Sequence, residues 1–530
     1  MKRCPDCRRT YDDQRLKFCR IDGTALVDVS DFPEADETVD LSLSQDSFET
    51  RRQLETAPVL RMSPAAGQPS IAVLPFVNMS TDRENEYFCD GLAEELLNAL
   101  AKLEGLKVAA RTSAFSFKGK DVRVSDVGRA LNVTTVLEGS VRKLGNRLRI
   151  MAQLINVADE YHLWSERYDR QMEDVFDIQD EITFTIVNEL KIKLLGAEKT
   201  KPLKRHTANA EAYEAYLRGR YYLHKFTVED WNKALTYFED VIDKEPEHAR
   251  AYASTALCWS ALWYYGSLPP HEIVPQWKAA ASRAVEIDDD LAEAHFSLAN
   301  ILFYYDWDPE AARREFKRAI ELNPNSADAH LFYGLFLAAG GTLDEAIKQG
   351  ERAIELDPLS PLVNVQVGWI YWLANNLDSA LAQAHRLIDM DSDSFGGYWL
   401  LGGINLARGR CEDAIEAYQK SVALGGGSIV QSALGCAYGI AGKRDEALKV
   451  LNHLVEIKKQ RYLPAFDIAR IYKGLGQIDL MFEWLGKACE ERNGELVFLD
   501  EISKVGTGIL GTGASDQRVL DLLRRKGLKA

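Results

Sequence analysis

Three cysteines near the start of the chain have the spacing of a metal site. In CPDCRRTYDDQRLKFCRIDG, Cys4 and Cys7 form a C-x₂-C pair, and Cys19 follows after eleven intervening residues. Zinc binds thiolates well, and a C-x₂-C pair can direct two sulfur atoms at one ion. Asp22 stands where a second C-x₂-C pair would have its last cysteine. We predict a structural Zn²⁺ ion held by Cys4, Cys7, Cys19 and Asp22; the alternative is three incidental thiols.

The same stretch resembles the zinc-ribbon-like modules that begin many bacterial multidomain regulatory proteins. The resemblance rests on CP-x-C followed by FC-x-x-DG, and it implies a small module over residues 1–27. A module this short has too little core to fold without a metal. No open coordination position or activating base is evident, so we expect the zinc to be structural and not catalytic. Residues 1–23 carry seven Lys and Arg against four Asp, which makes the module locally basic.

The composition of the whole chain indicates a multidomain protein with an acidic surface. The 530 residues carry a formal net charge of −16, which disfavours broad binding to nucleic acid. We find no apolar run of about 18 residues that could cross a membrane. The first residues, MKRCPDCRRTYDD, lack the apolar core of a secretory signal. We therefore expect a cytoplasmic protein without membrane insertion, and the sequence leaves its oligomeric state open.

Small residues recur at a nearly fixed interval in the second half of the chain. The intervals are 35, 34, 34, 33 and 34 residues, and the recurring residues are Ala299, Gly334, Gly368, Gly402, Gly435 and Ala469. Proline ends the second helix in RAIELNP and RAIELDP. The pattern resembles the tetratricopeptide repeat, which implies stacked helix pairs. We count about eight repeats over residues 211–492, after a basic hinge at 197–210 and before a C-terminal capping segment at 493–530.

The resemblance to tetratricopeptide repeats implies a concave groove lined by the first helix of each pair. The family's groove positions, carried over repeat by repeat, fall on Phe296, Asn300, Phe303, Tyr304, Leu331, Leu335, Trp369, Trp372, Trp399 and Phe466. Three of them are tryptophans in adjacent repeats, and aromatic anchors dominate peptide-binding interfaces. We predict that this groove binds a protein or peptide partner. The alternative is that the rings pack between repeats and meet no ligand.

The middle of the chain has the pattern of an α/β domain. Residues 28–69 are acidic and poor in aromatics, which predicts a flexible linker. Over residues 70–196, short apolar strands and amphipathic helices predict the order β-α-β-α-β-β-β-α. SIAVLPF, AARTSAFSFKGKD, VLEGSVRKLGNRLRI and WSERYDR resemble the TolB-like (FlgO-like) amino-terminal domain. In bacteria, domains of that family often lie between an N-terminal signalling or DNA-binding domain and C-terminal tetratricopeptide repeats. The resemblance implies the same position for residues 70–196.

One cluster in this domain could bind an anion. The polar and basic residues after a predicted strand are Arg111, Thr112, Ser113 and Lys118. FKGKD lacks the glycine spacing of a phosphate-binding loop. The chain also contains no G-x-S-x-G, no H-E-x-x-H and none of the kinase motifs. We predict that the protein is not an enzyme.

These observations predict a multidomain fold: a small zinc ribbon, then an α/β domain, then an all-α tetratricopeptide superhelix. The predicted function is a non-enzymatic cytoplasmic interaction scaffold or signalling adaptor. Two alternatives stay open. One is a transcriptional regulator that uses the basic zinc knuckle, and the other is a small-ligand sensor in the α/β domain.

Overall fold

The computed structural model describes two long stretches of the chain, residues 69–171 and 209–502, apart from residues 81, 83–84, 104, 145–146, 226, 266–267 and 500–501. Three short strands nearer the start are also described, namely β1 (Lys2–Arg3), β2 (Thr10–Tyr11) and β3 (Val27–Asp28). They form a small antiparallel sheet in the order β2-β1-β3. The rest of the predicted zinc module, most of the predicted acidic linker and most of the predicted basic hinge lie outside the described residues.

A mixed sheet forms the core of the α/β domain. Its strands are β4 (Ser70–Val73), β5 (Val77–Asn78), β6 (Lys107–Val108), β7 (Thr135–Leu144), β8 (Arg147–Asn156) and β9 (His162–Gln171). The order is β6-β4-β7-β8-β9, with β5 paired to β7; β4 runs parallel to β6 and β7, whereas β7, β8 and β9 are antiparallel. Along β8, buried Leu148 and Ile150 alternate with exposed Arg147 and Arg149, so one face of the sheet meets the core.

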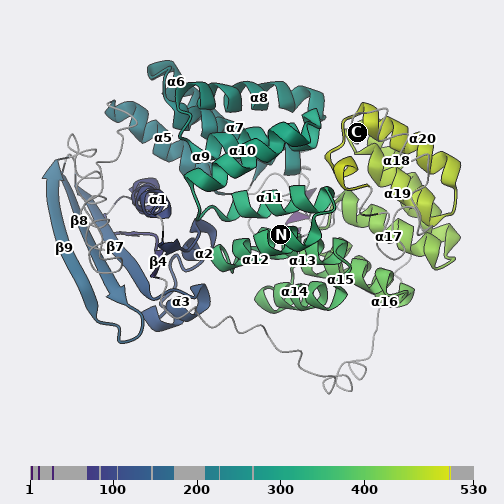
Figure 1. The fold of residues 1–530 in the computed structure, drawn as a ribbon, viewed down its shortest axis with the longest axis horizontal. Helices are drawn as coiled ribbons and strands as arrows, with labels where there is room; N and C mark the ends of the chain where they lie inside the picture. Colours follow the sequence, from purple (N-terminus) through teal and green to yellow (C-terminus); the bar gives the residue numbers. More distant parts are fainter. Residues whose placement is uncertain are drawn as a thin grey trace.

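Three helices accompany the sheet. They are α1 (Glu86–Ala101), α2 (Arg111–Phe115) and α3 (Val124–Leu131). Figure 1 shows β9 at the outer edge of the molecule and α1 between the sheet and the repeat helices. The sequence did not predict β5 or α2, because elements of two and five residues are too short to show a periodic pattern. The predicted closing helix of this domain lies outside the described residues.

The remainder of the described chain is helical, as predicted. Its eight helix pairs run from α5 to α20, with bounds α5 (Ala210–Leu223), α6 (Val228–Lys244), α7 (Ala249–Tyr265), α8 (Pro270–Ile287), α9 (Ala292–Ile301), α10 (Pro309–Leu322), α11 (Ala327–Ala339), α12 (Leu343–Leu356), α13 (Pro361–Leu373), α14 (Leu377–Met390), α15 (Phe395–Ala407), α16 (Cys411–Ala423), α17 (Ser428–Ile440), α18 (Arg444–Gln460), α19 (Ala465–Gly474) and α20 (Ile478–Glu490). A π-helical turn, η7 (Leu302–Asp306), follows α9, and a 3₁₀ turn, η8 (Gly494–Phe498), follows α20. Ser326, Ser360 and Ser394 cap three of the first helices by accepting backbone N–H bonds.

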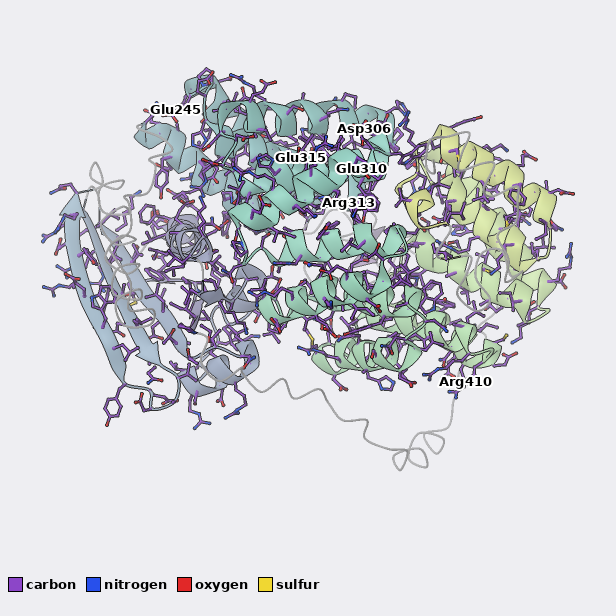
Figure 2. The ribbon with its side chains drawn as sticks, viewed as in Figure 1. Glu245, Asp306, Glu310, Arg313, Glu315 and Arg410 are labelled. Carbon is purple, nitrogen blue, oxygen red and sulfur yellow. The ribbon has the colours of Figure 1, made fainter. Side chains whose placement is uncertain are left out.

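The recurring small residues let neighbouring helices approach each other closely. A Cβ atom added to Gly402 would lie 2.6 Å from the ring of Tyr418, and one added to Gly368 would collide with Leu400. The helix pairs therefore stack side by side along a curved path (Figure 1). Charged side chains such as Glu310 on α10 and Arg410 before α16 are exposed to solvent (Figure 2).

Buried hydrogen bonds join the α/β domain to the middle repeats. Asn325, in the loop before α11, donates to the carbonyl oxygens of Ala101 and Leu106 at 2.9 Å each, and its Oδ1 accepts from Val108 N–H at 3.1 Å. Further along, the Asp357 carboxylate accepts from the Ser113 backbone N–H at 2.9 Å and from its hydroxyl at 2.5 Å. The repeats thus complete the hydrogen bonding of loops that belong to the α/β domain.

A buried carboxylate joins the same domain to the first repeat. Glu94 on α1 accepts from Arg111 Nε at 3.1 Å and from Arg220 Nε of α5 at 2.9 Å, and His224 Nε2 lies 3.2 Å away. Burial acts to raise the pKa of Glu94, but Arg220, His224 and Arg111 outweigh it and hold that pKa well below its usual range. Burial, with the neighbouring Arg111, lowers the pKa of His224 to about 4. The junction is therefore built for an ionised carboxylate and a neutral imidazole.

Replacing Asn325 tests the hydrogen-bonded part of the junction. Asn325→Leu leaves three buried backbone groups without a partner, so we expect the free energy of unfolding to fall by about 3 kcal/mol. Urea unfolding followed by circular dichroism measures this change. Asn232→Ala, at an exposed position on α6, is the matched control and should change it by less than about 0.5 kcal/mol. Equal effects of the two substitutions would contradict the junction as described.

The pH dependence of stability tests the buried imidazole. The pKa of His224 is about 4 in the folded chain and about 6.5 when unfolded, so the unfolded state binds more protons between these values. The free energy of unfolding should therefore fall as the pH drops from 6.5 toward 4. In His224→Gln we expect the fall between pH 7 and pH 4.5 to be smaller by about 2 kcal/mol. An unchanged fall would show that His224 does not titrate as described.

Candidate binding groove

The concave side of the repeats holds a cavity of about 710 Å³. Its wall comes mainly from the first helices of the pairs and from the C-terminal turn. The lining residues used below are Tyr264, Leu268, Tyr304, Gln366, Trp369, Trp372, Phe395, Trp399, Asp467, Arg470, Glu495 and Phe498. A volume of this size is typical of ligand sites, which bury most of a bound molecule. Most of the lining surface is apolar, so the cavity suits an aromatic or aliphatic group.

Four of the predicted groove residues line this cavity. Trp369 and Trp372 lie three residues apart on α13 and therefore on one face of that helix. The Trp372 indole N–H donates a 3.3 Å hydrogen bond to the Gly403 carbonyl oxygen of the next repeat. Trp399 on α15 and Tyr304 on η7 extend the aromatic wall. The rings thus belong to both the repeat packing and the groove surface.

The other predicted groove residues lie elsewhere. Leu331, Leu335 and Phe466 are exposed by at most 1% and pack inside the repeats, because their helices turn these positions toward neighbouring helices. Phe303 is also buried. Phe296 packs edge to face on Phe332 with 5.5 Å between ring centroids.

Asn300, the last predicted groove residue, is buried as well. Its Nδ2 donates a 2.8 Å hydrogen bond to the backbone carbonyl oxygen of Phe296, one turn earlier in the same helix. The groove positions of the tetratricopeptide family were transferred to this chain without knowledge of its local curvature. The resulting set therefore includes core residues as well as groove residues.

The rim of the cavity carries exposed apolar side chains that the sequence analysis did not identify. Tyr264, Leu268 and Phe395 are exposed by 43%, 46% and 43%, respectively, and all three line the cavity. Large apolar side chains gathered at the mouth of a pocket mark a binding surface. The signal in the sequence was present in WYYGSLPP and DSFGG, where aromatic or aliphatic residues stand at the ends of helices.

A buried charged cluster also lines the cavity. Arg470 Nη1 donates to Ser432 Oγ at 2.6 Å and to Asp467 at 3.2 Å, and its Nη2 donates to Glu495 at 2.5 Å. Burial raises the pKa of Asp467, although Arg470 counteracts this effect. These are the polar groups that could orient a ligand whose apolar part meets the tryptophans.

The residues of the predicted anion site are held by the protein's own groups. Arg111 pairs with Glu94, and Lys118 Nζ lies 2.6 Å from an Asp90 carboxylate oxygen. The Ser113 hydroxyl donates to Asp357, as described above. Thr112 is exposed. The anion site stays a prediction, and the positive charges that suggested it are matched by nearby carboxylates.

The predicted zinc ligands Cys4, Cys7, Cys19 and Asp22 lie outside the described residues, so the zinc site stays a prediction. Among the residues that the structure describes, no group of three or more His, Cys, Asp or Glu is placed to hold a metal ion. Within the same residues, no helix combines the length and apolar character needed to span a membrane.

Two protein families match parts of the chain. Residues 301–361 and 368–429 match the tetratricopeptide repeat, which confirms the predicted repeats in this part of the chain. Residues 67–185 match the second domain of HilA/YgeH-like transcriptional regulators. This second match covers the described α/β domain, for which the resemblance to TolB-like domains stays a prediction.

One relative overturns a prediction. "Putative adenylate cyclase 3" of Rhizobium meliloti (strain 1021) is 41% identical over 235 residues, which are 44% of this chain and 40% of that protein. The prediction that the protein is not an enzyme is contradicted by this similarity to a protein named as a cyclase. The prediction was wrong because it rested on the absence of a few catalytic motifs. Their absence excludes only the enzyme classes that carry those motifs.

More distant similarities were also found. "Transcriptional regulator HilA" of Salmonella paratyphi A is 21% identical over 300 residues, which are 55% of this chain and 52% of that protein. The crystal structure of PilW, a type IV pilus biogenesis factor, is 18% identical with a TM-score of 0.34 and covers 40% of this chain and 93% of its own. The chain spans about half or less of the curated relatives it matches. It contains tetratricopeptide repeats that follow a domain similar to the second domain of HilA/YgeH-like regulators.

Proposed function

We propose that the chain is a protein-interaction scaffold whose concave groove binds a peptide segment of a partner. The observation that carries this proposal is the gathering of large aromatic side chains, half-buried or exposed, at one cavity. Trp369, Trp372 and Trp399 line its wall, while Tyr264 and Phe395 stand at its rim. A tetratricopeptide region is commonly a protein-binding surface, and its aromatic residues are the natural anchors.

The chemistry of the groove favours a peptide with both apolar and polar groups. Aromatic walls bury large apolar side chains and offer edge-to-face contacts. The Arg470 guanidinium and the Asp467 carboxylate, which also line the cavity, can fix the direction of a bound chain through hydrogen bonds. Gln366, whose Nε2 donates to the Tyr264 hydroxyl at 2.5 Å, adds a polar group near the rim.

The junction between the domains supports a scaffold role. Asn325 and Asp357 bind the α/β domain through buried hydrogen bonds, and Glu94 binds α5. A partner held in the groove would therefore stand at a fixed position relative to the sheet. Such an arrangement can hold the partner at a defined distance from the α/β domain.

A regulatory role in transcription is a second candidate. It is supported by the match of residues 67–185 to the second domain of HilA/YgeH-like regulators. The basic stretch at residues 1–23 would then contact DNA. Binding of the full chain to random duplex DNA, measured at 50 mM and 200 mM salt, tests it: affinity that falls steeply with salt supports the role. Absence of binding at the lower salt concentration rejects it.

Nucleotide cyclisation is a third candidate, supported by the relative named "Putative adenylate cyclase 3". Incubation of the full chain with ATP and Mg²⁺ or Mn²⁺, followed by chromatography for cyclic AMP, tests this activity. Formation of cyclic AMP supports it, and unchanged ATP rejects it.

Removing two groove tryptophans tests the scaffold proposal. Trp369→Ala with Trp372→Ala deletes two aromatic anchors, so we expect capture of the groove's partner to fall at least about tenfold. The full chain serves as bait in a bacterial lysate, and mass spectrometry quantifies captured proteins. Circular dichroism should show unchanged helical content.

The matched control is Tyr161→Ala, because Tyr161 is an aromatic residue exposed by 73% outside the groove. Its capture profile should equal that of the unsubstituted chain. If the double variant keeps its helical content and still captures the same proteins in the same amounts, the groove is not the binding surface.

A further inference from the structure

The groove is partly occupied by the chain's own C-terminal turn, η8. After α20 the chain returns to the middle repeats, where Arg492 Nη1 donates a 2.7 Å hydrogen bond to the carbonyl oxygen of Tyr305. Leu496 is fully buried and Phe498 is exposed by only 3%. The turn therefore packs against helices that lie far before it in the sequence, and not only against the last repeat that it follows.

Phe498 contacts the aromatic wall as a ligand side chain would. Its ring lies 4.5 Å from that of Trp369, centroid to centroid, with 73° between the ring planes. It also meets Phe303 edge to face, at 5.9 Å. Tilted and edge-to-face pairs are the favourable geometries for aromatic rings, and each contributes beyond its buried area. Phe498 thus uses the tryptophan that we propose as an anchor for a partner.

Glu495 makes the polar contact of the same turn. Its carboxylate accepts a 2.5 Å hydrogen bond from Arg470, while the Asn493 side chain begins the turn by accepting from Glu495 N–H at 3.0 Å. In a 3₁₀ helix, residues three apart lie directly above each other. The carboxylate and the ring of Phe498 therefore face the groove from one side of the turn.

We infer that residues 493–499 are an intramolecular ligand of the groove and that the partner presents the same chemistry: a short helical turn with an acidic residue three positions before an aromatic one. This inference rests on the proposed scaffold function and names its partner class. The acidic residue would replace Glu495 at Arg470, and the aromatic residue would replace Phe498 at Trp369.

Competition with the tethered turn then sets the affinity for partners. A ligand on the same chain acts at an effective concentration on the order of millimolar, so a free peptide of equal intrinsic affinity binds weakly. The cavity is also lined by Trp372, Phe395 and Trp399. A partner segment longer than the turn can contact these side chains as well, and this extra contact lets it displace the turn.

The test uses the full chain and a fluorescein-labelled peptide of sequence NGELVFLDEI, which corresponds to residues 493–502. Fluorescence anisotropy measures its binding to the unsubstituted chain, to Phe498→Ala and to Phe498→Leu. The leucine variant keeps apolar volume at position 498, so its peptide binding can be measured even if the alanine variant unfolds. A scrambled peptide and the protein variant Leu480→Ala, exposed on α20, are the controls.

We expect both Phe498 variants to bind the peptide at least about tenfold more tightly than the unsubstituted chain, because they weaken the competing turn. Adding Trp369→Ala to either variant should abolish this gain, and a peptide with Gln in place of its first Glu, which corresponds to Glu495, should bind at least about threefold more weakly. Equal binding by all proteins, or a gain that survives Trp369→Ala, overturns the inference. Partner capture that depends on Trp369 and Trp372 without peptide binding overturns the inference alone and leaves the scaffold function standing.

Discussion

The burial of Glu94 constrains the whole arrangement, because an ionised carboxylate inside a protein must have partners. Two of these partners, Arg220 and His224, come from the first repeat, while Arg111 comes from the α/β domain itself. Removing a partner from such a cluster costs several kcal/mol, so these contacts favour docking of the two parts of the chain. At later repeats, Asn325 and Asp357 make buried hydrogen bonds that likewise hold the α/β domain against the superhelix. The sheet domain is thus fixed to the superhelix along one side.

Because the α/β domain covers one side of the superhelix, the concave face is left to bind a partner. Close packing at glycines such as Gly402 brings neighbouring helices together, and the concave face gathers aromatic side chains from α13 and α15. The C-terminal turn returns into this face and places Phe498 on Trp369. In a groove with its own internal ligand, the same contacts stabilise the fold and determine which partner can bind. The contacts that bury the turn therefore define the side chains that a partner must present.

The helical repeats could be predicted from the sequence because their signal is local and periodic. Trp369, Trp372 and Trp399 were correctly placed near one another, since each lies on the first helix of its pair. Pairings across long separations could not be read from one chain: nothing local links Glu94 to Arg220. For the same reason the pairing of Arg111 with Glu94 could not be predicted from the sequence.

A direct test of the central claim, that the concave face is the binding surface, is photo-cross-linking in bacterial cells. Phe395, at the rim of the groove, and Leu480, exposed on α20, would each be replaced by benzoylphenylalanine in otherwise unchanged chains. The account predicts that irradiation joins a defined protein to position 395 and not to position 480. Cross-links of equal yield at both positions, or at position 480 alone, would contradict it.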